Sequence, residues 1–239
     1  MATIARPDRS RLQLRHSLSW LTWLLIGIIC TLGLSVWATH SPRFPGDLKT
    51  AQLIQQLESP RLTSAVQLLS RLTAPKYLAV LGLAAAAFLL LVRRDRTAAL
   101  AVTGATLAML LTYQELKAII DRPRPESDLV TVFNSARDAS FPSGHAFAAM
   151  VVFGGLFCFA QALGQHRRTV RAFRALALGG ILGVGFARIY LGAHWPSDVA
   201  GGYLFGALAL FIAYRIARVA AAWAHGPLAL ASGPPTGRH

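Results

Sequence analysis

Hydrophobic residues in this chain are gathered into long blocks that polar and charged residues separate. A helix needs roughly 20 predominantly apolar residues to cross the hydrocarbon core of a bilayer. Six blocks approach that length: Leu18–Thr39, Tyr77–Val92, Ala98–Leu116, Ala146–Gly164, Ala172–Tyr190 and Val199–Ala222. The pattern predicts an all-α, polytopic membrane protein with six transmembrane helices in a bundle.

The first block follows a basic segment, and a basic start before an apolar run is also typical of a secretory signal. Its apolar core is about as long as a full span, and no small-x-small cleavage site follows it. We therefore interpret the first block as an uncleaved span.

Residues 40–76 form the longest segment between two blocks. Their apolar residues recur at roughly helical spacing, and Pro60 interrupts the pattern. We expect two short amphipathic helices lying at the outer interface of the membrane, which serve as a lid, as a lipid-entry element or as a surface connector. Residues 1–225 then form one integral-membrane domain, and the Gly- and Pro-containing tail 226–239 is expected to be disordered.

Composition agrees with the membrane interpretation, because 54% of the residues are hydrophobic and only 14% are charged. Such values are unusual for a soluble domain. Cys30 and Cys158 both fall inside apolar blocks, where we interpret them as small apolar residues without a disulfide or a metal site.

The net charge of +14 comes largely from arginines at the ends of the blocks. The clusters are Arg6, Arg9, Arg11 and Arg15; Arg93, Arg94 and Arg96; Arg167, Arg168, Arg171 and Arg174; and Arg215 and Arg218. With six spans, all four clusters lie on one side, as the positive-inside rule requires. We expect cytoplasmic termini, with the opposite loops on the periplasmic face of a bacterial inner membrane. The basic clusters lack the interleaved aromatic residues of a nucleic-acid groove, so no nucleic-acid partner is expected.

The first cluster of candidate chemistry begins at the end of the third block. Lys117 closes that block, and Arg124 follows in a loop that contains Pro123 and Pro125. The prolines stiffen the loop, and a guanidinium offers a planar fork to phosphate oxygens. In a purely structural alternative, Lys117 reaches the interface from a span end while Arg122 and Arg124 are solvated.

The second cluster is the sequence Ser-Phe-Pro-Ser-Gly-His at residues 140–145. Pro142 suits the first position of a helix, so we expect the helix cap one or two residues before it. The amides of Ser143 and Gly144 would then be free at a helix N-terminus, which is a natural anion site. His145 lies next in the chain, where it could deliver a proton.

The third cluster joins the end of the fifth block to the start of the sixth. Arg188 precedes His194, and Pro196 marks a helix start that puts Asp198 in the first turn. An aspartate on one ring nitrogen would orient the imidazole and leave the other nitrogen free to attack. The structural alternative is an interfacial histidine beside a helix-capping aspartate.

Together, Lys117–Pro125, Pro142–His145 and Arg188–Asp198 resemble the three-part signature of the type 2 phosphatidic acid phosphatase superfamily. The resemblance implies an integral-membrane lipid phosphatase that works through a phosphohistidine. His194 would be the nucleophile, Asp198 its orienting carboxylate and His145 the general acid.

By the same resemblance, the phosphoryl oxygens are held without any metal or other cofactor. Their ligands would be Lys117, Arg124, Ser143, Gly144 and Arg188. One position departs from the family pattern, since Ala187 stands where a serine usually precedes the arginine of the third motif. This change removes a hydrogen bond beside Arg188 but no assigned catalytic role.

The expected substrate is a lipid phosphate monoester or diphosphate, such as phosphatidylglycerophosphate, phosphatidate, a lipid A phosphate or undecaprenyl diphosphate. A phosphotransferase could use the same phosphohistidine with a lipid acceptor, and a non-catalytic lipid transporter or scaffold could bind the same headgroups. Transporters place ionisable residues near the bilayer midplane, whereas these clusters lie at span ends on one face. That placement favours the enzyme.

Overall fold

The computed structural model describes residues 9–133, 136, 138–164 and 166–225, and the tail 226–239 lies outside the described residues. Within those ranges every regular element is an α-helix, which confirms the all-α prediction. The elements are α1 (Arg9–His40), α2 (Asp47–Gln55), α3 (Pro60–Leu72), α4 (Pro75–Leu91), α5 (Arg96–Ile120), α6 (Gly144–Cys158), α7 (Ala160–Leu163), α8 (Arg167–Tyr190) and α9 (Pro196–His225).

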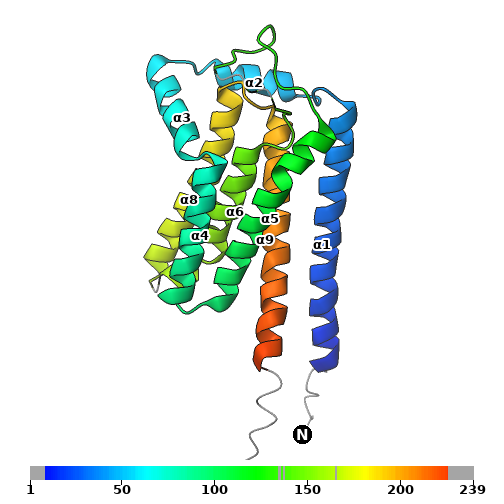
Figure 1. The fold of residues 1–239 in the computed structure, drawn as a ribbon, viewed down its shortest axis with the longest axis vertical. Helices are drawn as coiled ribbons and strands as arrows, with labels where there is room; N and C mark the ends of the chain where they lie inside the picture. Colours follow the sequence, from blue (N-terminus) through cyan, green and yellow to red (C-terminus); the bar gives the residue numbers. More distant parts are fainter. Residues whose placement is uncertain (1–8, 134–135, 137, 165, 226–239) are drawn as a thin grey trace, which may run out of the picture.

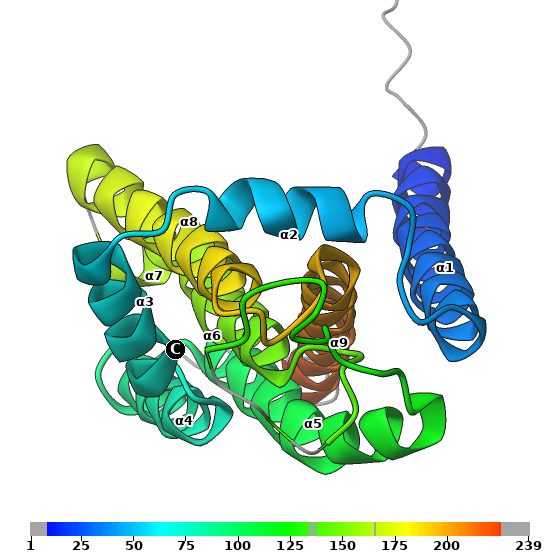
Figure 2. The same ribbon diagram turned by 90° about the horizontal axis from the view of Figure 1, so that it is seen from above.

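Helix α6 lies at the centre of the bundle, where it packs against α4, α5, α8 and α9 (Figure 1). Helix α1 stands at the side of the bundle and contacts α9 and α5. Figure 2 shows α2 crossing one end of the bundle, from α1 towards α3 and α8. The central helix is therefore enclosed by protein, while the outer helices present apolar side chains to their surroundings.

Four helices are long and apolar enough to cross a membrane: α1 from Ser19, α5, α8, and α9 as far as Trp223. Helices α3 and α4 together would count as a fifth span, bent by 56°. Helix α6 has only 15 residues. Every block predicted from the sequence contains a helix, but the number of six spans stays a prediction.

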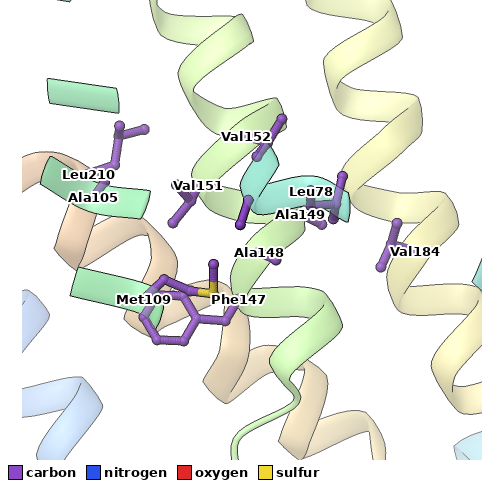
Figure 3. Packing of buried hydrophobic residues seen from close by; sticks show 11 residues of the cluster. Leu78, Ala105, Met109, Phe147, Ala148, Ala149, Val151, Val152, Val184 and Leu210 are labelled. Carbon is purple, nitrogen blue, oxygen red and sulfur yellow. The ribbon is translucent and has the colours of Figure 1, made fainter. Parts of the chain in front are cut away.

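The core around α6 contains both small and large apolar side chains (Figure 3). Ala148, Ala149 and Val151 of α6 are fully buried, and Met109 of α5 and Phe147 fill the space between helices. Small residues allow helix backbones to approach closely, which is how helices pack well without a hydrophobic driving force between them.

Residues 40–76 form two short helices, as predicted, and Pro60 is the first residue of the second. Ser59 caps α3 by accepting a hydrogen bond from the amide of Leu62. Gln55 at the end of α2 donates to the carbonyl oxygens of Thr131 and Tyr190, at 2.7 and 3.0 Å. The segment is thus attached to the loops at this end of the bundle.

The described residues of the basic clusters lie at the opposite end of the bundle from α2, and Arg6 lies outside the described residues. Figure 1 shows the α4–α5 turn, the start of α8, the start of α1 and the end of α9 all at that lower end. Arg93, Arg94 and Arg96 lie beside Ala220 of α9 there. This arrangement agrees with the distribution of charge expected from the sequence.

Helices α6 and α9 approach so closely that only glycine fits at one contact. A β-carbon on Gly202 would lie 2.5 Å from the carbonyl oxygen of Ser143 and 3.0 Å from the amide nitrogen of Phe147. Both are backbone atoms, so the helices would have to separate. A β-carbon on Gly179 of α8, by contrast, would meet no atom within 4 Å.

We predict that Gly202→Ala destabilises the protein by about 1–3 kcal/mol, the usual effect of overpacking. Gly179→Ala is the control, because it adds the same methyl group in open space. Thermal unfolding of the purified protein in detergent measures the difference. Equal unfolding midpoints for the two variants would show that the α6–α9 contact tolerates a side chain.

Candidate active site

The three predicted clusters meet at the end of the bundle that α2 covers. Lys117 comes from the last turn of α5, His145 from the first turn of α6 and Arg188 from the last turn of α8. His194 lies two residues before the start of α9, and Asp198 lies in the first turn of that helix. All four loops or helix ends face one another because the helices pack side by side.

The start of α9 brings the side chains of His194 and Asp198 close together. The carboxylate of Asp198 accepts a hydrogen bond from the amide of Trp195 at 2.8 Å. Its Oδ2 lies 3.7 Å from Nδ1 of His194. Ser140 lies between the two side chains, since its hydroxyl is 2.5 Å from Asp198 Oδ2 and 3.4 Å from His194 Nδ1. The aspartate and the serine together orient the imidazole from one side.

The other ring nitrogen of His194, Nε2, faces the cations. It lies 3.3 Å from Nη1 of Arg124, which also donates to the carbonyl oxygen of Ala193 at 2.5 Å. Burial lowers the pKa of His194 well below its usual value, and the charges of Arg188, Arg124 and Lys117 lower it further. The imidazole is therefore uncharged at neutral pH and keeps a lone pair for attack.

Arg188 and His145 both contact α3, which the sequence did not associate with the site. Nη1 of Arg188 donates to the hydroxyl of Ser70 at 2.6 Å. Nε2 of His145 lies 3.3 Å from the carbonyl oxygen of the same serine. A carbonyl only accepts hydrogen bonds, so this geometry places the ring proton on Nε2.

Lys117 and Arg124 share a partner that sequence reasoning missed. Nζ of Lys117 lies 2.5 Å from Oδ2 of Asp138, and Nη2 of Arg124 lies 2.8 Å from Oδ1. Partial burial raises the pKa of Asp138, but the hydrogen bond and charge of Lys117, with Arg124, outweigh it and lower the pKa to about 2. Asp138 is thus ionised and bridges the two cations.

The start of α6 differs from the expectation. Ser143, rather than a residue before Pro142, is the N-cap, and its hydroxyl accepts from the amide of Ala146 at 3.5 Å. The amide of Ser143 is not free, because it donates to the backbone carbonyl of Asp198 at 3.0 Å. A serine cap is preferred because its side chain satisfies an orphan amide. Gly144 now begins the helix, packed against the ring of Tyr113.

Arg122 also lies in the candidate site, although the sequence pattern allowed a solvated position for it. It is only 1% exposed. Its guanidinium donates to Asp198 Oδ1 at 2.5 Å and to Asp47 Oδ2 at 3.0 Å. It also contacts the hydroxyl of Ser197 at 2.8 Å. Its position in a proline-containing loop gave no periodic signal of burial.

Ala187, which departs from the family pattern, is fully buried in an apolar cluster with Val66 and Tyr190. An alanine suits that environment without an unsatisfied hydroxyl. Across the described ranges, no group of three or more His, Cys, Asp or Glu side chains could hold a metal ion.

Comparison with known proteins identifies the family of this chain. The PAP2 superfamily model matches residues 97–221, just over half of the chain. Phosphatidylglycerophosphatase B of Bacillus subtilis (strain 168) is 32% identical over 108 residues, which are 43% of this chain and 49% of that relative. The match therefore spans about half the length of this curated relative.

Two solved structures share the fold. The first transmembrane PAP2-type phosphatidylglycerolphosphate phosphatase from Bacillus subtilis covers 82% of this chain and 96% of its own, with a TM-score of 0.63 and 22% identity. Aquifex aeolicus LpxE covers 72% of this chain and 96% of its own, with a TM-score of 0.53 and 25% identity. The protein is an integral membrane protein of this fold, and its family match over residues 97–221 shows that it belongs to the PAP2 superfamily, as its three motifs predict.

Proposed function

We propose that this protein is a membrane lipid phosphatase that hydrolyses a lipid phosphate monoester or diphosphate through a phosphohistidine on His194. The observation that carries the proposal is the environment of His194. One ring nitrogen lies beside Asp198 and Ser140, and the other lies 3.3 Å from a guanidinium of the cationic cluster. A neutral nucleophile beside fixed cations suits attack on a phosphate.

In the first step, Nε2 of His194 attacks the terminal phosphorus, and the bond from that phosphorus to the leaving oxygen breaks. The leaving oxygen belongs to the lipid alcohol of a monoester or to the remaining phosphate of a diphosphate. Lys117, Arg124 and Arg188 balance the negative charge on the phosphoryl oxygens, and the amide of Gly144 at the start of α6 adds a donor. The hydroxyl of Ser143 stays a helix cap in this scheme. His145 enters this step protonated on both ring nitrogens, a form that the negative charge of the bound phosphate favours, and donates one proton to the leaving oxygen.

In the second step, water attacks the phosphohistidine and the nitrogen–phosphorus bond breaks. His145 accepts the proton of the water, so both histidines return to their starting states and inorganic phosphate leaves. Asp198 and Ser140 stabilise the positive charge that the imidazole carries while it is phosphorylated. A metal ion has no part in these steps.

The substrate class follows from the surroundings of the site. The reacting residues lie at the ends of apolar helices, where a phosphorylated headgroup can reach the cations while its acyl or prenyl chain stays in the membrane. The Bacillus subtilis relative is named for phosphatidylglycerophosphate, a lipid phosphate monoester. We place phosphatidylglycerophosphate, phosphatidate and undecaprenyl diphosphate in the substrate range.

We expect the purified protein to release phosphate from these lipids in excess chelator and His194→Ala to abolish the release, because nothing replaces the nucleophile. His166→Ala, which changes the exposed residue just before α8, at the end of the bundle opposite α2, is the control. Release by His194→Ala within tenfold of wild type, a barrier change of only ~1.4 kcal/mol, would refute the assignment.

Arg122 is expected to act as a positioning residue. Arg122→Lys keeps the charge, but one ammonium cannot bridge Asp47 and Asp198 as the guanidinium does. We predict that kcat falls at least about tenfold while KM changes little, because the hydrogen bonds of Arg122 go to residues outside the proposed phosphate ligands. Arg71→Lys, on the exposed side of α3, is the matched control. A raised KM with unchanged kcat would instead place Arg122 in substrate binding.

We further propose that the site faces the periplasm and both termini face the cytoplasm, because the arginine clusters lie at the end opposite the site. In a background without Cys30 and Cys158, a cysteine at Ser127 should react with a membrane-impermeant thiol reagent in intact cells. A cysteine at His166 should not react until the membrane is opened. Both positions are exposed, so the reverse labelling pattern would place the site in the cytoplasm.

A further inference from the structure

Asp138 occupies the place that the proposed mechanism gives to the substrate's phosphoryl oxygens. Its two carboxylate oxygens are divided between Lys117 and Arg124, at 2.5 and 2.8 Å. Arg124 is in turn 3.3 Å from the nucleophilic nitrogen of His194. The carboxylate therefore satisfies the same donors that an incoming phosphate would need.

Asp138 is more exposed to solvent than the two cations that it contacts. The side chains of Lys117 and Arg124 are 6% and 14% exposed, whereas that of Asp138 is 44% exposed. The carboxylate thus covers the cations on their solvent side. Backbone contacts strengthen its hold, because Nε of Arg124 also donates to the carbonyl oxygen of Asp138 at 2.8 Å.

An anion that enters the site has to compete with this carboxylate. A phosphodiester headgroup carries one negative charge, so exchanging it for the ionised Asp138 leaves the charge at the cations unchanged. A phosphate monoester carries about −1.5 to −2 at neutral pH and has more terminal oxygens, so its exchange gains electrostatic energy. Most lipids around a membrane enzyme are not phosphate monoesters. Competition with the Asp138 carboxylate would keep these other lipids out of the site.

We propose that Asp138 is a specificity-determining residue, an internal anion that excludes phosphodiester headgroups and gives way to phosphate monoesters or diphosphates. The inference rests on the proposed function for the identity of the substrate. The low pKa of Asp138, about 2, means that protonation does not release it at physiological pH, so only a competing anion does. Asp138 is not assigned a bond-making step.

The test compares Asp138→Asn with Asp128→Asn. Both remove one negative charge from the segment between α5 and α6, and Asp128 is exposed. Binding of inorganic phosphate is measured first, from the phosphate concentration that stabilises the purified protein against thermal unfolding. Turnover of a lipid phosphate is then measured in mixed micelles with increasing dioleoylphosphatidylglycerol, a phosphodiester lipid.

We expect Asp138→Asn to bind inorganic phosphate about tenfold more tightly, equivalent to ~1.4 kcal/mol. Dioleoylphosphatidylglycerol should inhibit this variant at about tenfold lower concentration than it inhibits wild type. Asp128→Asn should match wild type in both measurements. Asp138→Ser, which also removes the charge, gives a second measurement of both quantities if the Asn variant does not fold.

Unchanged or weaker phosphate binding by folded Asp138 variants would overturn the inference and show that Asp138 only supports the cations. Unchanged inhibition by the phosphodiester lipid would overturn it as well. Phosphate binding needs no turnover, so the two proposals can fail separately. A wild-type protein that releases no phosphate refutes the proposed function, while tighter phosphate binding by Asp138→Asn still supports the internal anion.

Discussion

A carboxylate buried as completely as that of Asp198 needs a partner of opposite charge, and here the partner is the guanidinium of Arg122 at 2.5 Å. Removing one member of a buried ion pair costs roughly 3–5 kcal/mol, because the other charge is left without compensation. Arg122 also pairs with Asp47 at the start of α2. One buried arginine thus fixes the helix that covers the site, the α5–α6 loop and the first turn of α9. The geometry of His194 depends on this network.

The acidic residues near the site divide into two kinds. Asp47 and Asp198 are buried and share the single guanidinium of Arg122, which holds both carboxylates within the packed end of the bundle. Asp138 is the exposed member, and it faces Lys117 and Arg124 instead. Two of the cations that would hold a phosphate therefore share Asp138 as their counter-charge. Asp47 and Asp198 therefore stabilise the fold through Arg122 without occupying Lys117 and Arg124.

The chemistry sits at helix ends because the bundle is apolar along its length. Helix α6 is enclosed by four helices, and its small side chains and Gly202 of α9 let backbones come close enough for the amide of Ser143 to reach the carbonyl of Asp198. That bond connects the second and third motifs directly. A polar cluster in the middle of the bundle would lack water and backbone donors, which the ends supply. The close contact that packs α6 against α9 thus also joins these two motifs.

The sequence by itself determined the helical blocks, the two short helices around Pro60, and the helix start at Pro196 that brings His194 and Asp198 near each other. These features depend on periodicity, proline and short spacing, which neighbouring residues carry. Only the tertiary structure decided that Arg122 is buried, that Ser70 contacts Arg188 and that Asp138 bridges Lys117 and Arg124. Ser70 is 118 residues from Arg188, and Asp47 is 75 from Arg122. Contacts over such separations leave no local pattern, because they exist only once the packed helices bring distant side chains within hydrogen-bond reach.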